Sequence, residues 1–290
     1  MDGPQLTSPR LVREILQRHK LVPNKGLGQN FLIDKNILAK IIAAVKIKPE
    51  DTILEVGPGL GVLTSPLAAR AGRVVAVEVD KGLIPPLREN LGAYPNVKIV
   101  QGDILKISLA SLVEDINTPL KVVANLPYYI TSAVIMTLLT GPLNLQCMVL
   151  MVQREVAQRL LAVPGTKDYG ILTAAVGYYT VPEIIAPVPR TVFYPSPAVD
   201  SAVVRLRVRE SPPVEVEDEG LFFRLIRGAF GQRRKTLLNS LGGEFKGEYT
   251  REELARFLLE AQIGKKRRGE TLNLEEFARL ERIIKNRGKK

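Results

Sequence analysis

Between residues 51 and 152, short apolar runs alternate with stretches that carry turn residues or a helical spacing of apolar positions. A short apolar run bounded by turn residues is typical of a buried strand. Strands that alternate with helices build a parallel sheet that is covered on both faces. The sequence therefore predicts an α/β fold here. The predicted strands are Thr52–Val56, Arg73–Val79, Val97–Gln101, Leu120–Asn125 and Cys147–Val152.

The character of the chain changes after Arg209. Before it, the runs Val181–Val188 and Ala198–Val208 predict two more strands, separated by a proline-rich stretch. Residues 210–220 are acidic and contain two prolines, which indicates a linker. Everything beyond has a helical period and no strand candidate. We therefore expect a first domain over residues 1–209 and a small all-α domain over 221–290.

The N-terminal region predicts a helix followed by a loop. Ser8 and Pro9 have the residue types of a helix cap and a first helical position, and apolar residues then recur on one face over residues 8–20. The stretch Asn24–Asp34 carries two glycines and several amides, which indicates a loop before the next helix, Lys35–Val45. This loop is either a ligand-binding segment or only a capped connection.

Polar residues collect where the predicted parallel strands end. The first strand runs into Gly57-Pro-Gly-Leu-Gly61, whose alternate glycines predict a tight turn that a ligand can approach closely. The polar residues at the strand ends are Glu55, Glu78, Asp103 and Asn125. Any single acid here is readily explained as a helix cap. Together they favour a cofactor site of the nucleotide type, because such sheets bind ligands at the carboxyl ends of their strands.

Composition and charge add a polyanionic partner to this picture. The chain has 290 residues, of which 46% are hydrophobic, and its formal charge is 41 − 30 = +11. That hydrophobic content excludes a disordered chain, and the charge favours nucleic acid over a merely solvated basic surface. The predicted helix Leu221–Leu241 carries much of the charge, and Lys265–Arg268 forms a second cluster. The basic residues expected to contact this RNA or DNA backbone are Arg227, Arg233, Arg234 and Lys235.

Several classes of function are excluded by residues that are scarce. Cys147 is the one cysteine and His19 the one histidine, so an internal disulfide, a zinc cluster and a histidine-based triad are not expected. We interpret Cys147 as a core residue and His19 as a surface residue without a partner acid, and we expect no metal. No apolar stretch approaches the ~18 residues of a membrane span, and the first residues lack the pattern of a leader. We expect a cytoplasmic protein with no membrane contact.

The fourth strand is followed by Asn125-Leu-Pro-Tyr128, which has the chemistry to hold a flat base with an exocyclic amine. The Asn125 side-chain oxygen and the Leu126 carbonyl are acceptors for that amine. Pro127 stiffens the turn, and Tyr128 offers a ring on which the base stacks. The alternative is a turn with a buried tyrosine and no ligand.

Together these stretches and several others resemble the bacterial small-subunit ribosomal RNA adenine dimethyltransferases, in order and nearly end to end. The resemblance rests on Gly28–Leu32, Leu54–Gly61, Val77-Glu78, Gly102-Asp103, Asn125–Tyr129, Phe193–Ser201 and Phe230–Thr236. It implies a Rossmann-like class I methyltransferase sheet with helices on both faces, together with the small helical domain. Each motif alone is weak, and their common order makes the resemblance specific.

The resemblance also implies roles for individual residues. The cofactor would be S-adenosyl-L-methionine and the product S-adenosyl-L-homocysteine. Asn30 and Leu32 would close over the cofactor, and Gly57 would give room beside its methionine part. Glu78 would accept from the ribose hydroxyls and Asp103 would bind the adenine amine. Asn125 would contact both cofactor and target, while Phe193 would stack on the target base opposite Tyr128.

The implied reaction is methylation of adenine N6, twice on each of two adjacent adenosines near the 3′ end of small-subunit (16S) ribosomal RNA. The substrate would be the RNA or a pre-assembled small subunit, with a role in subunit biogenesis, and no obligate protein partner is evident. Three alternatives remain: a large-subunit ribosomal RNA methyltransferase of the macrolide-resistance type, a nicotinamide-dependent dehydrogenase, and a non-catalytic RNA-binding assembly factor. The last is compatible with catalysis.

Overall fold

The computed structural model describes residues 6–232 and 234–287, and the chain divides into two compact units. The first consists of Met1–Ala157 and Pro182–Val208, and the second of Gln158–Val181 and Arg209–Lys290. The change of unit after Val208 lies next to the boundary predicted at residue 209. The second unit also contains residues 158–181, which the sequence assigned to the first domain.

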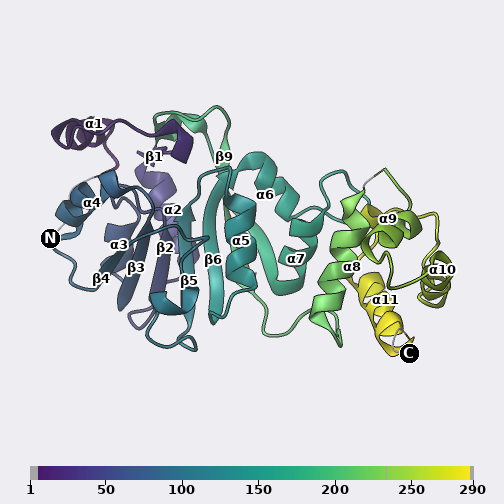
Figure 1. Ribbon diagram of the computed structural model, residues 1–290. Helices are drawn as coiled ribbons and strands as arrows, with labels where there is room; N and C mark the ends of the chain where they lie inside the picture. Colours follow the sequence, from purple (N-terminus) through teal and green to yellow (C-terminus); the bar gives the residue numbers. More distant parts are fainter. Residues whose placement is uncertain (1–5, 233, 288–290) are drawn as a thin grey trace. The chain divides into compact units, whose positions relative to one another are not determined.

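The first unit is built on a seven-stranded sheet with the order β4-β3-β2-β5-β6-β9-β7. Strands β4 to β6 are parallel neighbours, and β9 runs antiparallel to β6. Figure 1 shows the sheet with α5 in front of it and α2 behind it. This confirms the predicted α/β class. The strands are β2 Thr52–Val56, β3 Arg73–Glu78, β4 Val97–Gln101, β5 Leu120–Asn125, β6 Leu145–Gln153, β7 Thr180–Val188 and β9 Ser201–Val208.

Helices of the first unit begin at residues that cap them. Ser8 accepts from the Leu11 amide at the start of α1, with Pro9 in the first turn, as predicted. Asp34 accepts from two amides at the start of α2. α2 packs against β6 and β9, α3 against β3 and α4 against β4. The helices are α1 Pro9–Arg18, α2 Lys35–Val45, α3 Thr64–Ala68, α4 Ile84–Leu91, α5 Thr131–Leu139 and α6 Arg154–Leu160, which ends in the second unit.

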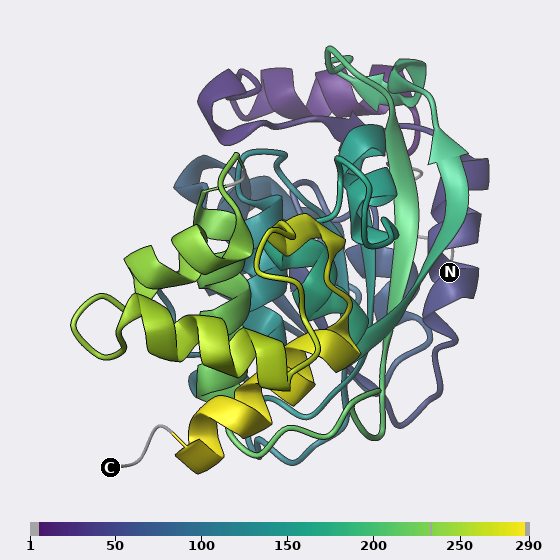
Figure 2. The same cartoon turned by 90° about the vertical axis from the view of Figure 1, so that its right-hand side faces the viewer.

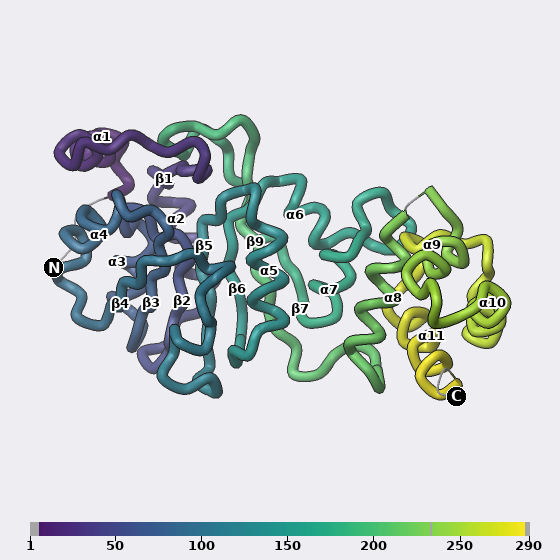
Figure 3. Tube along the Cα trace, viewed as in Figure 1, coloured from purple at the N-terminus to yellow at the C-terminus, as the bar shows by residue number. Residues whose placement is uncertain are grey.

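A small second sheet joins two distant parts of the first unit. Strand β1, Phe31–Leu32, pairs antiparallel with β8, Phe193–Tyr194. Figure 3 shows the purple N-terminal segment beside the green segment that follows β7. Because both strands are short and apolar, pairing buries Phe31, Leu32 and Phe193 in the core. The pairing fixes the N-terminal loop over the carboxyl ends of the main strands.

The second unit is helical, as Figure 2 shows for its green and yellow part. Its core contains the fully buried rings of Tyr178, Phe222, Phe257 and Phe277. Arg209 donates to the Gly177 and Thr180 carbonyls and so joins the two segments of this unit. The helices are α7 Ile171–Tyr179, α8 Glu219–Gly231, α9 Leu237–Glu244, α10 Arg251–Glu260 and α11 Leu274–Arg287. None of the helices in the described part of the chain is long and apolar enough to span a membrane.

The predicted helix Leu221–Leu241 is wrong as a single element. It is interrupted between α8 and α9, where Gln232 has the non-helical angles φ −136° and ψ 77°. The Leu237 amide, at the start of α9, donates to the Arg267 carbonyl at 2.7 Å. A partner from a distant loop therefore replaces the helical continuation, which the local apolar period could not reveal.

Candidate active site

A cavity of about 250 Å³ lies where the parallel strands end. It is walled on one side by the N-terminal loop 27–32 and on the others by residues that follow β2, β3, β4 and β5. The six residues predicted to bind the cofactor all line it: Asn30, Leu32, Gly57, Glu78, Asp103 and Asn125. The structure thus brings together residues that are up to 95 positions apart in the chain.

The turn after β2 brings its backbone to the cavity wall. Gly57 and Gly59 have φ angles of +70° and +61°, which side chains with a Cβ rarely adopt. A Cβ on Gly59 would lie 3.2 Å from the Phe31 ring of the N-terminal loop. The Gly57 amide donates to the Val77 carbonyl at 2.9 Å, which ties the turn to β3. The turn is therefore rigid and leaves no side chain between its backbone and a ligand.

Glu78 ends β3 and is held by two backbone amides. Its Oε2 accepts from the Gly59 amide at 3.0 Å, and its Oε1 accepts from the Asp80 amide at 2.9 Å. Burial raises the pKa of Glu78, and these amides oppose that shift. A carboxylate oxygen has two acceptor positions, so each oxygen keeps one for a further donor. A diol is a suitable ligand for such a carboxylate.

Asp103 follows β4 and Asn125 ends β5, and both line the cavity. Asp103 accepts from the Leu105 amide at 3.0 Å through Oδ1, and Lys106 lies 3.7 Å from Oδ2. Asn125 Nδ2 donates to the Asn30 carbonyl at 2.9 Å, which orients the side-chain amide. Among the described residues, no donor contacts Asn125 Oδ1 or the Leu126 carbonyl. Two acceptors are therefore free.

The turn Asn125–Tyr128 is ordered by contacts on both sides. Leu126 is buried at 1% exposure, and its amide donates to the Met151 carbonyl at 3.2 Å. Pro127 lines the cavity. The Tyr128 hydroxyl lies 2.7 Å from Ser201 Oγ at the start of β9, and burial raises the pKa of Tyr128. Tyr128 does not line the cavity. The contact of its hydroxyl with Ser201 anchors the ring.

The structure differs from the expectation for Phe193. Its side chain is 3% exposed and belongs to the apolar cluster of the first unit, because β8 pairs with β1. A ring must be accessible on one face to stack on a base. Phe193 therefore is a core residue in this structure rather than an exposed stacking platform.

Two residues that line the cavity, Tyr129 and Gln29, were assigned no role from sequence, and Glu55, which was grouped with the polar residues of the predicted cofactor site, does not line it. Tyr129 lines the cavity and is 64% exposed, directly after the predicted tetrapeptide. Gln29 lines it too and donates to Asp80 at 2.7 Å. Glu55 is fully buried, and burial raises its pKa to about 8. Tyr129 and Gln29 lie within the stretches Asn125–Tyr129 and Gly28–Leu32 that carry the resemblance, and this was the signal available for them.

The interpretation of His19 changes with the structure, and Arg224 is engaged within the second unit. His19 is not without a partner, because its Nε2 lies 3.0 Å from Glu89, which also pairs with Arg18. Arg224 on α8 binds Glu244 and Glu248 and lies over the Phe245 ring. Its charge is therefore satisfied within the second unit.

Of the proposed RNA-binding residues, three are exposed and one cannot be described. Arg227 on α8 and Arg234 and Lys235 between α8 and α9 are exposed, and none has an ion pair within the described residues. Arg233 lies outside the described residues. Three cations with exposed side chains on one helical unit are a suitable surface for phosphates.

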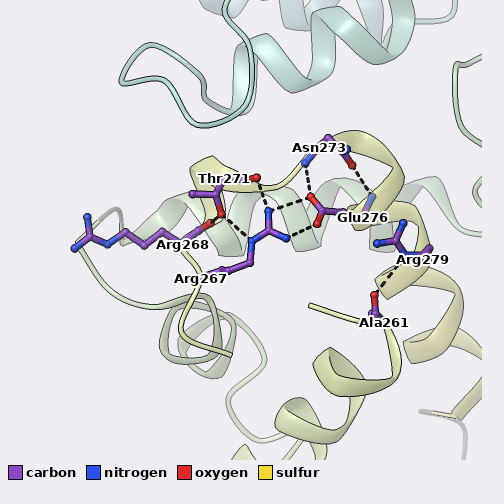
Figure 4. Close-up of polar contacts among 7 residues, drawn as sticks. All are labelled: Ala261, Arg267, Arg268, Thr271, Asn273, Glu276 and Arg279. Atoms are coloured by element: carbon purple, nitrogen blue, oxygen red, sulfur yellow. Dashed lines mark hydrogen bonds and ion pairs between the residues drawn. The ribbon is translucent and has the colours of Figure 1, made fainter. Parts of the chain in front are cut away.

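The second basic cluster is divided between structure and surface. Figure 4 shows Arg267 turned toward Thr271 and Glu276, with Arg268 pointing away from them. Arg267 makes a two-pronged ion pair with Glu276, with one contact of 3.1 Å. Lys265, Lys266 and Arg268 are exposed. Arg267 therefore stabilises the loop, and its neighbours are free to meet an anion.

Comparisons with known proteins show the family of the chain. The family model of ribosomal RNA adenine dimethylases matches residues 21–280. A ribosomal RNA small subunit methyltransferase A of Pelotomaculum thermopropionicum is 51% identical over 283 residues, which is 95% of this chain and 96% of that protein. A protein of the same name from a Geobacillus species is 48% identical over 285 residues, 97% of this chain and 98% of that one.

Solved structures show the same fold. A dimethyladenosine transferase of Plasmodium falciparum has a TM-score of 0.75 and 29% identity, over 89% of this chain and 98% of that chain. The 23S rRNA methyltransferase ErmE has a TM-score of 0.65 and 30% identity, over 88% and 100%. The family model and the nearly full-length relatives show that this chain belongs to the ribosomal RNA adenine dimethylases, S-adenosylmethionine-dependent enzymes with a class I, Rossmann-like methyltransferase fold.

Proposed function

We propose that the protein methylates N6 of two adjacent adenosines near the 3′ end of small-subunit ribosomal RNA, giving N6,N6-dimethyladenosine and supporting small-subunit biogenesis. The observation that carries this proposal is a pair of free acceptors: Asn125 Oδ1, on a residue that lines the cavity, and the carbonyl of Leu126, the next residue in the chain. An exocyclic amine has two N–H groups, so it suits two acceptors. Relatives at 48% and 51% identity, named for the small subunit, favour it over the large-subunit alternative at 30%.

S-adenosyl-L-methionine fits the cavity through its polar groups. The free acceptor positions of Glu78 suit the two ribose hydroxyls, and Asp103 suits an adenine amine. The positive-φ turn at Gly57 leaves backbone beside the methionine part. Asn30 and Leu32 would cover the cofactor from the N-terminal loop. The bound cofactor supplies a methyl group on a cationic sulfur, and the product is S-adenosyl-L-homocysteine.

The chain's own contribution to the reaction is orientation. In the first methylation, Asn125 Oδ1 and the Leu126 carbonyl would each accept a hydrogen bond from one N–H of the amine, which would turn the nitrogen lone pair out of the ring plane toward the cavity. The Asn125–Asn30 bond holds the amide so that its oxygen faces the target. Tyr128 offers its ring to the base while Ser201 fixes its hydroxyl. The leaving group would be the neutral thioether of S-adenosyl-L-homocysteine. Each transfer would leave a proton on the methylated nitrogen that passes to water, so no histidine base is required.

Ribosomal RNA would be gripped by the exposed cations of the second unit. Arg227, Arg234, Lys235 and the exposed neighbours of Arg267 are the residues for its phosphates, and Arg233 is proposed from sequence alone. Because the proposed substrate is ribosomal RNA, or a partly assembled small subunit, we place the protein in the cytoplasm. The dehydrogenase alternative would leave both the Asn125–Tyr128 turn and this surface without a role.

The direct test is Asn125→Ala, assayed by digesting methylated ribosomal RNA to nucleosides. We expect dimethyladenosine formation to fall roughly tenfold or more, the effect of losing a buried hydrogen bond in the reacting complex. Binding of S-adenosylhomocysteine, measured by calorimetry, should weaken less. The matched control is Asn36→Ala, an exposed amide on α2. Near-normal methylation by the Asn125 variant would refute the assignment.

A further inference from the structure

Gln29 links the N-terminal loop to the strand end that carries Glu78. Its Oε1 accepts from the Asn24 amide at 2.8 Å, at the start of the loop. Its Nε2 donates to Asp80 Oδ2 at 2.7 Å, across 51 residues of sequence. Both ends of this side-chain amide are therefore used, which makes it a bridge rather than a surface group.

Asp80 continues the connection to Glu78. Its Oδ1 accepts from the Gly82 amide at 2.8 Å, so both carboxylate oxygens of Asp80 are engaged. With the side chain fixed in this way, the Asp80 backbone amide donates to Glu78 Oε1 at 2.9 Å. The Gly59 amide holds the other oxygen of Glu78. The chain of hydrogen bonds thus runs from the loop through Asp80 to the cavity carboxylate.

The hydrogen bonds through Asp80 connect two walls of the same cavity. Loop residues 27–32 form one wall of the cavity, and Glu78 forms another. A second bond, from Asn125 to the Asn30 carbonyl, holds the loop on the side of the target turn. The loop is therefore held on both sides, and of these two side-chain hydrogen bonds the one from Gln29 leads to the carboxylate. Loss of that hydrogen bond would leave Glu78 with a less rigid donor.

We propose that Gln29 is a positioning residue that couples closure of the N-terminal loop to recognition of the cofactor ribose, acting through Asp80 on Glu78. This inference rests on the proposed contact between Glu78 and the ribose. Ribose binding and loop closure then stabilise each other, because both require the same orientation of Asp80. Gln29 touches neither the reacting methyl group nor the target amine.

The test compares Gln29→Ala with the unchanged protein, using calorimetry with S-adenosylhomocysteine and with its 2′-deoxy analogue. Removing a hydrogen bond to a carboxylate should weaken binding of S-adenosylhomocysteine roughly tenfold. The analogue lacks one hydroxyl that Glu78 would bind, so its affinity should fall much less in the variant. In kinetics, KM for the cofactor should rise while kcat changes little. An equal loss for both ligands would overturn the proposal, since it would mean that Gln29 merely tethers the loop.

Matched variants keep the outcome interpretable. Lys25→Ala changes an exposed side chain of the same loop and should bind both ligands as the unchanged protein does. In Asp80→Asn the side chain keeps one acceptor oxygen for the two donors, Gln29 Nε2 and the Gly82 amide. The loss of affinity for S-adenosylhomocysteine in this variant should therefore not add to the loss in Gln29→Ala when both changes are combined. Additive losses would contradict the connection. If Glu78→Gln keeps the full preference for the ribose hydroxyl, the assignment of Glu78 fails instead, whatever the result for Gln29.

Discussion

Glu55 is a buried acid that the proposed chemistry does not use, and it makes a measurable prediction about stability. It lies in β2, has no exposed surface, and neither carboxyl oxygen meets a hydrogen-bond partner within the described residues. Burial raises the pKa of Glu55 from 4.5 to about 8; the neighbouring Thr64 opposes the shift and the charge of Glu78 adds to it. The folded protein therefore holds this carboxyl neutral at pH 7.

The size of the effect follows from the two pKa values. The unfolded chain releases the proton above pH 4.5, and the folded chain retains it up to about pH 8. Below pH 4.5 both states are protonated, so the carboxyl costs nothing; between the two values the free energy of unfolding falls as the pH rises. At pH 7 the span is 7 − 4.5 = 2.5 pH units, which corresponds to about 3 kcal/mol.

The perturbation is Glu55→Gln, which keeps the shape and removes the titration. Denaturant unfolding of both proteins between pH 5 and pH 8 measures the difference in free energy of unfolding. From pH 5 to pH 8 the free energy of unfolding of the variant should rise by about 3 kcal/mol relative to that of the unchanged protein. The contributions of all other titrating groups are the same in both proteins and cancel in the difference. Glu50→Gln, an exposed acid before the same strand, should show no such trend. A difference that does not vary with pH would refute the neutral carboxyl.

Four further variants test residues placed by the structure. Phe193→Ala should lower the free energy of unfolding by about 3–5 kcal/mol, the usual cost of removing a buried ring, and a normal melting temperature with lost methylation would contradict its core position. Arg267→Ala should destabilise the protein by about 2 kcal/mol, whereas Arg268→Glu should leave melting unchanged and flatten the salt dependence of RNA binding; the reverse pattern would exchange their roles. Lys121→Met removes the cation that lies 2.5 Å from the buried Asp51 and leaves its carboxylate with the Lys48 amide as a donor, so it should cost about 3–5 kcal/mol in chemical unfolding; a neutral result would show that the amide is enough to hold the charge.

The strands of the main sheet could be predicted because buried strands have a recognisable sequence pattern. In β2, β3 and β5 nearly every residue is buried, so each reads as a continuous apolar run with turn residues on both sides. The predicted and observed bounds of β2, β4 and β5 coincide. The polar residues at the ends of these strands could also be identified from sequence, because an acid or amide that interrupts an apolar run indicates a functional or capping role. The cavity residues Glu78, Asp103 and Asn125 were found by that signal.

Contacts between distant segments were not visible in the same way. The apolar period continues from α8 into α9, but the Arg267 carbonyl binds the Leu237 amide and a new helix starts there. Lys265–Arg268 reads as four equivalent cations, although Glu276 engages only Arg267. In both cases the partner lies in a segment whose position depends on the rest of the fold, and local spacing carries no trace of it.

Phe193 and Tyr128 show why a residue type fixes chemistry but not exposure. Both are aromatic residues of the stretches that carry the resemblance, and both were expected to stack on the target base. Pairing of β8 with β1 buries Phe193, while the turn after β5 leaves Tyr128 half-buried with its hydroxyl on Ser201. The pairing that removes Phe193 from the surface is also the one that holds the N-terminal loop over Glu78. Phe193 therefore contributes to the cavity by holding the N-terminal loop, which forms one of its walls. That role requires a buried ring and not one with an accessible face.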